Sequence, residues 1–288
     1  MKRFRGLLAI PIVAAVVMGL LLAWYRAYAP GDLGDRFARA QQRWDIFTVG
    51  STWSFLARGL VITLELALLS IGLSLVFAVG LALLRLAPHP RMRAPIPGAA
   101  IVSRAAGVLV EIVRSSPLFM LIIYSFIALP RLGIDLSPFW AGVGALTLYT
   151  SCVTSEIVRA GILSLERGQF EAAMALGLGY TKRIRFVVLP QALRRMVPAI
   201  VSQLVTLIKD TSLVSFITVF ELARRGQALQ QLANNPIETS IVLMALYFVV
   251  NLSLSELSRR LEMRPGRAGR AQPSAAIGAE DQIPAIRP

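Results

Sequence analysis

Long apolar runs are the feature that most limits what this chain can fold into. An α-helix needs about 20 mostly apolar residues to cross the hydrocarbon core of a bilayer, and six stretches of the 288-residue chain reach or approach that length. Short polar segments separate them. The sequence therefore predicts an all-α membrane protein with six transmembrane helices, over residues 7–25, 60–84, 108–129, 140–163, 197–220 and 241–261.

The composition agrees with a membrane protein and limits the other classes. The chain is 56% hydrophobic and 16% charged, with a mean hydropathy of +0.64, which is more apolar than an ordinary soluble domain. The formal net charge is +14, but the basic residues cluster between apolar runs and not on an aromatic-studded polar surface. This placement of the basic residues predicts no nucleic-acid partner. With one cysteine, Cys152, and one histidine, His89, we expect no internal disulfide and no metal site.

The distribution of Lys and Arg predicts how the spans are oriented. Basic residues near span ends accumulate on the cytoplasmic side. When the N-terminus is placed in the cytoplasm, most of the 30 Lys and Arg residues fall there, including the clusters that follow the second, fourth and sixth spans. We therefore expect both termini to be cytoplasmic.

The chain divides into three parts. Residues 1–50 contain an N-terminal anchor helix and an extracytoplasmic segment with a short surface helix near 35–44, and residues 51–262 form the main transmembrane domain. Residues 263–288 are rich in Pro, Gly, Ala and charge, and this composition predicts a disordered cytoplasmic tail. The end of the first span resembles a signal-peptide cleavage site. Because the apolar run is long and Pro30 would follow the cut, we favour a retained anchor over cleavage.

The stretch EAAMALGLGYTKRIRFVVLP, residues 171–190, interrupts the apolar runs within a cytoplasmic loop near 164–196. This loop is too short to bury a core of its own. Gly177 and Gly179 break the helix that the flanking residues favour, so we expect two short helices that meet at a glycine elbow. Apolar residues recur every four positions and predict one apolar stripe, formed by Ala172, Leu176, Tyr180, Ile184 and Val188.

Two prolines and the local charge add to this prediction. Pro190 and Pro198 bracket the entry into the fifth span, which predicts a fixed bend there. The residues alone leave two interpretations equally open. The segment is either an amphipathic helix on the lipid surface or a small apolar element, with Glu171 at a helix start, that docks into a cytoplasmic partner.

The same stretch resembles the EAA signature of the inner-membrane permease subunits of ABC importers. That signature has Glu-Ala-Ala, three residues, a glycine, nine residues, and then Ile-x-Leu-Pro. The segments EIVRSSPL at 111–118 and LIKDTSLVSFITVFEL at 207–222 are similar to the permeases for polar amino acids, and the resemblance covers about residues 59–261. Val187 stands in place of the Ile, and the matching positions are Glu171, Ala172, Ala173, Gly177, Leu189 and Pro190.

The resemblance implies a type I importer permease bundle with a five-helix core, to which this chain adds the N-terminal anchor. It implies that the EAA loop contacts an ATPase subunit, and that the partners are two ABC ATPase subunits, a second permease copy or a sister permease, and an extracytoplasmic solute-binding protein. The chain contains no Gly-x-x-x-x-Gly-Lys-Ser/Thr loop. We therefore expect ATP and Mg²⁺ to bind to the ATPase partner, no cofactor on this chain, and a multi-pass location in the bacterial cytoplasmic (inner) membrane.

Ionisable side chains within the expected spans are a second set of candidate functional residues. Each costs roughly 2.5 to 3.5 kcal/mol at the centre of a membrane helix, so it needs a partner or a water-filled path. Two Glu–Arg pairs are spaced three residues apart and share a helix face, whereas the adjacent Lys209 and Asp210 point in different directions and are expected to meet different neighbours. The candidates for a translocation path or for intramembrane ion pairs are Glu65, Glu111, Arg114, Glu156, Arg159, Lys209 and Asp210.

These charges have two interpretations. They either pair and specify helix packing, which we favour for Glu111 with Arg114, or they line a route for a solute that carries both a carboxylate and an ammonium, as an amino acid does. Glu65 either extends to the outer surface or lines an outward-facing vestibule.

Alternatives to an amino-acid importer remain at this point. Permeases of the polar amino-acid branch often have an Asn and an Ala-Tyr pair before the Glu-x-x-Arg of the fourth span, whereas residues 149–154 read Tyr-Thr-Ser-Cys-Val-Thr. An ABC permease for another small solute is therefore one alternative. An ion-coupled secondary transporter, in which Glu65, Glu156 or Asp210 takes protons, and a non-transporting scaffold are the others. The EAA resemblance favours the importer permease.

Overall fold

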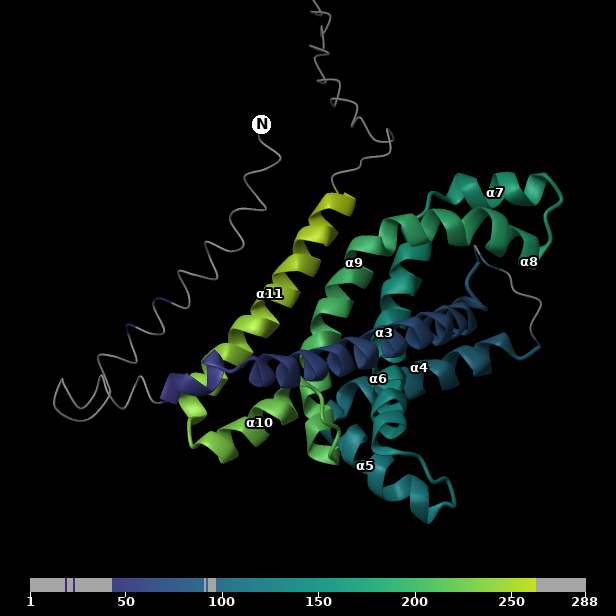
Figure 1. The fold of residues 1–288 in the computed structure, drawn as a ribbon. Coiled ribbons are helices and arrows are strands. Elements are labelled where there is room, and N and C mark those ends of the chain that lie inside the picture. Colours follow the sequence, from purple (N-terminus) through teal and green to yellow (C-terminus); the bar gives the residue numbers. More distant parts are fainter. Residues whose placement is uncertain (1–18, 20–22, 24–42, 91, 93–96, 263–288) are drawn as a thin grey trace, which may run out of the picture.

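The computed structural model describes residues 19, 23, 43–90, 92 and 97–262, and every regular element in this part of the chain is helical (Figure 1). The all-α prediction is therefore confirmed. The expected N-terminal span, the surface helix near 35–44 and the C-terminal tail lie, apart from isolated positions, outside the described residues.

Four long helices form the body of the bundle. The second, fourth and sixth expected spans lie within α3 (Gly50–Leu86), α6 (Pro138–Leu163) and α11 (Pro236–Glu262), and the fifth begins within α9 (Leu189–Asp210). The fifth span then continues as the 3₁₀ helix η3 (Thr211–Ile217). Three helical stretches of the described residues, 50–86, 180–217 and 236–256, are long and apolar enough to cross a membrane.

The central helix α6 carries polar side chains within the bundle. Its middle carries hydroxyl side chains that are buried against the rest of the bundle, among them Thr150, Ser151, Thr154 and Ser155. Buried hydroxyls and small residues let membrane helices approach closely. Accordingly α3 crosses α6 over its longest interface and also contacts α9 (Figure 1).

The expected third span is wrong as a single helix. The chain forms α4 (Ala99–Ser115) and α5 (Leu118–Arg131), which meet at an angle of 101°. Ser116 has extended backbone angles, φ −82° and ψ 139°, as steric contact with the ring of a following proline favours. Pro117 therefore ends α4 and lets α5 start in a new direction. With this bent pair taken as one span, the described residues contain up to four apolar spans.

The loop near 164–196 rests on the bundle and has no separate core. A buried cluster joins Phe170, Ile184 and Val188 of this loop to Ile162 on α6 and Ala82 on α3. This arrangement confirms that the loop leans on other elements. At the opposite end of the bundle, α10 (Leu222–Ala233) packs between α3 and α11.

Candidate functional site

The glycine elbow of the EAA segment is present as expected. Helix α7 (Arg167–Ala175) is followed by Gly177, which has φ 71°, and then by α8 (Tyr180–Arg183). The Leu178 amide donates to the Ala173 carbonyl at 3.1 Å and the Gly177 amide to the Met174 carbonyl at 2.9 Å. This is the Schellman pattern of helix termination, which favours glycine at the left-handed position.

The expected apolar stripe is correct only after the elbow. Ile184 and Val188 are buried and Tyr180 is partly buried, but Ala172 is exposed and Leu176 is 79% exposed. Phe170 and Ala173 provide the buried face of α7 instead. The elbow changes the chain direction between the two helices, so one four-residue period cannot describe both.

The remaining EAA residues lie mostly on the outer side of this segment. Glu171 is exposed and pairs with Arg167, with 2.6 Å between Nε and Oε1, while Ala173 packs inward. Leu189 is partly buried and Pro190 is exposed in the first turn of α9. The exposed side also carries large apolar side chains, namely Met174, Leu176 and Phe186. An exposed apolar surface with charges around it is suited to a protein partner.

The segment re-enters the bundle through a continuous helical path. A π-helical turn, Ile184–Val188, joins α8 to α9 without a break, and Figure 1 shows this stretch lying along α7 before the chain bends into α9. Pro190 lies in the first turn of α9 and Pro198 in its interior, so the entry into the fifth span that they bracket is helical. The side chain of Arg183 is buried and donates to the Met92 carbonyl between α3 and α4, a contact that the sequence did not predict.

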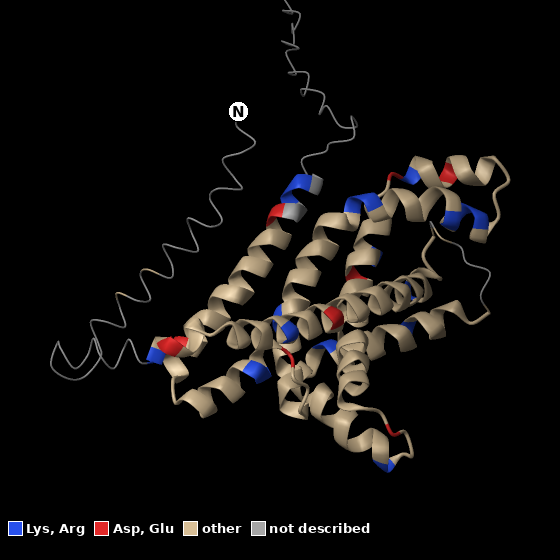
Figure 2. Cartoon of the chain, viewed as in Figure 1, with Lys and Arg blue, Asp and Glu red and all other residues tan. Residues whose placement is uncertain are grey.

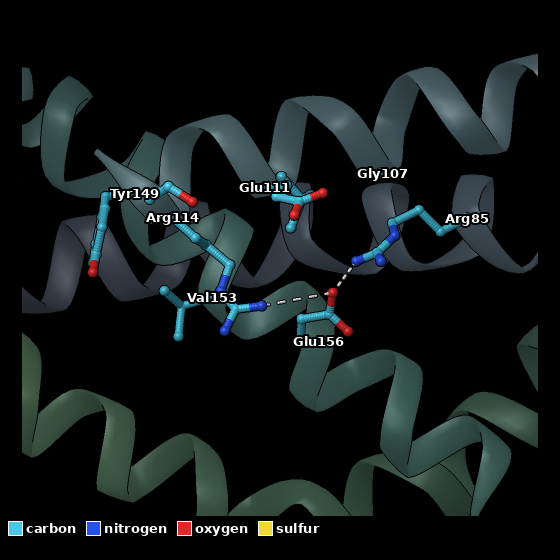
Figure 3. A pocket seen from close by; sticks show the side chains of 9 residues that line it. Arg85, Gly107, Glu111, Arg114, Tyr149, Val153 and Glu156 are labelled. Atoms are coloured by element: carbon cyan, nitrogen blue, oxygen red, sulfur yellow. Dashed lines mark hydrogen bonds and ion pairs between the residues drawn. The ribbon is translucent and has the colours of Figure 1, made fainter. Parts of the chain in front are cut away.

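Three arginines contact Glu156, and two of them, Arg85 and Arg114, are seen in Figure 3. Arg159 on the same helix donates to Glu156 with 2.8 Å between Nε and Oε2, which confirms that expected pair. Arg85, in the last turn of α3, donates to the other carboxylate oxygen. Arg114 of α4 also points to that oxygen, with 3.8 Å between Nη1 and Oε1.

The expected pairing of Glu111 with Arg114 is wrong, because Arg114 faces Glu156 on α6. Within the described residues Glu111 forms no ion pair, although it lines the same pocket as Arg114. The crossing of α4 and α6 decides this exchange of partners, and the i,i+3 spacing on α4 does not reveal it. Sequence reasoning also missed Arg85, whose position at the end of an apolar run made it look like a cytoplasmic flanking residue.

The pocket beside this cluster has a volume of about 590 Å³. This lies in the usual range for a small-molecule site. Residues from α3, α4 and α6 line it, including Arg85, Glu111, Arg114, Tyr149, Val153 and Glu156. The pocket therefore combines both signs of charge with an aromatic and an aliphatic wall.

The other candidate charges lie apart from this pocket. Lys209 is exposed and Asp210 half-buried at the end of α9, and neither forms an ion pair with the residues that the structure describes. Their partners on neighbouring elements stay a prediction. Glu65 is exposed on α3 and lines a second pocket of about 480 Å³ with Phe139, Val219 and other residues.

Glu221 is a buried carboxylate that the sequence analysis did not select. It accepts hydrogen bonds from Thr63 of α3 at 3.2 Å and from Tyr247 of α11 at 3.0 Å. It also accepts from the amides of Ala223 and Arg224, at 2.9 and 2.8 Å, and so caps α10. Burial raises the pKa of Glu221. Its place directly before a helix is the only sequence signal for this role, and Glu is not a typical capping residue.

An all-helical bundle with an exposed helix, glycine elbow and helix at one end has the architecture of a permease subunit of a membrane importer. Residues 99–266 match the family described as binding-protein-dependent transport system inner membrane component, and the chain belongs to this family. It is a multi-pass protein of the bacterial inner membrane.

Individual relatives agree with this assignment. The chain is 44% identical over 214 residues to the probable glutamine ABC transporter permease protein GlnP of Bacillus subtilis (strain 168), covering 73% of this chain and 94% of that protein. It is 32% identical over 211 residues to the arginine transport system permease protein ArtQ of the same organism, covering 73% and 92%.

The fold has solved counterparts as well. The chain is similar to the crystal structure of an amino acid ABC transporter with histidines, with a TM-score of 0.66 and 28% identity, over 76% of this chain and 98% of that chain. The expectation of a type I importer permease fold is thereby confirmed, whereas the count of six helices is not decided by this likeness.

Proposed function

We propose that this chain moves a polar amino acid, delivered by an extracytoplasmic binding protein, into the cytoplasm as the permease subunit of an ATP-driven importer. The relatives named for glutamine and arginine transport support the substrate class. The observation that carries the proposal is the exposed EAA elbow, whose outer side presents Glu171 and Leu176 while its inner side is packed into the bundle.

The EAA elbow can transmit motion because it is rigid and held at two places. Phe170 and Ala173 fix α7 on the bundle core, and the π-helical turn continues from α8 into α9. A partner that grips the exposed side therefore displaces α9 and its neighbours together, since a packed core moves as a unit. We propose two ATPase subunits as the gripping partners, which bind and hydrolyse ATP with Mg²⁺, and a second permease copy or a sister permease beside this chain.

The orientation follows from charge. Figure 2 shows Lys and Arg gathered around α7, α8 and the adjacent ends of α9 and α11. Basic residues mark the cytoplasmic side. This supports six spans with both termini in the cytoplasm. On the same basis we propose that the Glu65 pocket lies toward the outer side and the Glu156 pocket toward the inner side, as two parts of the path.

Reconstituted uptake tests the proposal. We expect Glu171→Lys to abolish ATP-driven glutamine uptake by the permease with its ATPase and binding protein, because it reverses a charge on the gripped surface. Glu166→Lys, an exposed residue that lies just before α7, is the matched control and should retain uptake. Wild-type activity in Glu171→Lys would contradict the proposal, and so would uptake driven by a proton gradient without ATP or partner chains.

A further inference from the structure

We infer that Arg114 and Glu111 form a two-point binding site for the carboxylate and the ammonium of a zwitterionic α-amino acid, inside the pocket beside Glu156. The inference rests on the proposed function and names the two side chains of α4 that hold the solute. Both residues line this pocket of about 590 Å³.

Arg114 is the arginine of the cluster that a solute can capture most easily. Its Nη1 lies 3.8 Å from Glu156, beyond a normal hydrogen bond, whereas Arg159 and Arg85 both hydrogen-bond that carboxylate. The Arg114 side chain is also 47% exposed, against 20% for Arg85. When Arg114 turns to another anion, Glu156 keeps Arg85 and Arg159 as partners, so this partly buried carboxylate is not left unpaired.

The charge around Glu156 favours such an anion. Three guanidinium groups face one carboxylate, so the cluster itself is positive. An unbalanced charge at membrane depth is costly, and a carboxylate bound by a guanidinium in two parallel hydrogen bonds is among the strongest ways to balance it. The carboxylate of an amino acid has the shape and the charge that Arg114 binds best.

Glu111 supplies the opposite charge close by. It lies three residues before Arg114 on α4, on the same helix face, and forms no ion pair within the part of the chain that the structure describes. Figure 3 shows both side chains leaving α4 on the side where Glu156 lies. The two charges do not neutralise each other, and so both can engage one solute whose ammonium and carboxylate are attached to a single carbon.

The rest of the pocket suits the solute's side chain. Tyr149 and Val153 of α6 form a wall opposite α4. They offer an aromatic ring with a hydroxyl and an aliphatic surface, while Arg85 and Glu156, which also line the pocket, are paired with each other. The site therefore binds the α-ammonium and the α-carboxylate that all α-amino acids share. Selection among amino-acid side chains depends on other contacts.

Binding of three related compounds tests the inference. The full-length permease, assembled with its ATPase subunits in lipid nanodiscs, is titrated by saturation-transfer NMR with L-glutamine, with 4-aminobutanamide, which lacks the carboxylate, and with glutaramic acid, which lacks the ammonium. Because a charge-assisted hydrogen bond is lost with each group, wild type should bind glutamine about tenfold or more tightly than either analogue.

The two variants should change this preference in opposite ways. Arg114→Gln should lose the preference for glutamine over 4-aminobutanamide and keep the preference over glutaramic acid, and Glu111→Gln should do the reverse. Arg104→Gln is the matched control, since Arg104 is exposed on the same helix but lies outside the pocket. Arg114→Lys keeps the charge and should keep part of the preference, which separates recognition from a folding defect.

The outcomes separate this inference from the proposed function. If Arg114→Gln and Glu111→Gln both retain the wild-type preferences, or if Arg104→Gln loses them equally, the inference is wrong. The inference is also wrong if wild type binds glutamine no better than the analogues while the complete complex takes glutamine up with ATP. Failure of the wild-type complex to import any amino acid would overturn the proposed function itself.

Discussion

The buried guanidinium of Arg183 donates a hydrogen bond to the main-chain carbonyl of Met92, and this contact ties α8 to the connection between α3 and α4. The EAA elbow is thus attached to the bundle by a polar contact as well as by its apolar core. The helices α3 and α4 that this connection joins carry Arg85 and Arg114, which line the charged pocket.

Loss of this contact should weaken the coupling between ATP hydrolysis and uptake. Arg183→Ala leaves the Met92 carbonyl without its donor, so α8 can move without the α3–α4 connection. We expect the amount of solute moved per ATP hydrolysed to fall roughly tenfold, the effect of one charge-assisted hydrogen bond. Arg185→Ala, which removes an exposed arginine two residues later, should leave the ratio unchanged, and an equal loss in both variants would argue against the role of Arg183.

Removal of the Glu156 carboxylate should destabilise the bundle. Glu156→Gln leaves three guanidinium groups without an anionic partner in a partly buried position, which we expect to cost about 2 to 3 kcal/mol. Thermal unfolding in detergent measures the change. Glu256→Gln removes the carboxylate that Arg259 and Arg260 contact from the same helix, with arginine side chains that are 64% and 47% exposed, and should cost about 0.5 kcal/mol or less. Equal losses would show that pairing between helices does not set the cost.

Two glycines of α6 should respond oppositely to alanine. A Cβ at Gly142 would lie 2.5 Å from Cγ1 of Val214, a branched side chain that cannot easily turn away, whereas a Cβ at Gly144 meets nothing within 4 Å. Gly142→Ala should therefore destabilise the protein by about 1 to 3 kcal/mol. Gly144→Ala should be neutral or stabilise it by up to about 1 kcal/mol, because alanine favours the helix. Thermal unfolding of both variants measures the change. Equal unfolding temperatures for the two variants would show that the packed face of α6 is wrongly assigned.

The buried Glu221 should make stability depend on pH. Because burial raises its pKa in the folded state above the ordinary value of 4.5, the folded protein binds the proton more tightly than the unfolded chain. The stability from this difference is complete below the ordinary pKa and is lost as the pH rises through the raised pKa. Glu221→Gln cannot titrate, so its unfolding temperature should fall less than that of wild type over this range. Parallel pH profiles for the two proteins would contradict the prediction.

Several features of this protein follow from its sequence alone. Apolar runs of sufficient length can satisfy their backbone groups in a membrane only as helices, which fixes the fold class. Gly177 ends α7 because a left-handed residue favours glycine, and the EAA spacing around it marks the family. The extended backbone at Ser116 also has a local cause, the proline that follows it, although the apolar run on both sides concealed the break.

Only the tertiary structure decided which charges meet between helices. Arg114 pairs across the bundle with Glu156 and not with Glu111 on its own helix, Arg85 joins them from α3, and Glu221 binds Thr63 and Tyr247 from two other helices. Local periodicity shows which residues share the face of one helix. The angle and height at which two helices cross depend on the packing of all their neighbours, and this crossing selects the partner of each charge.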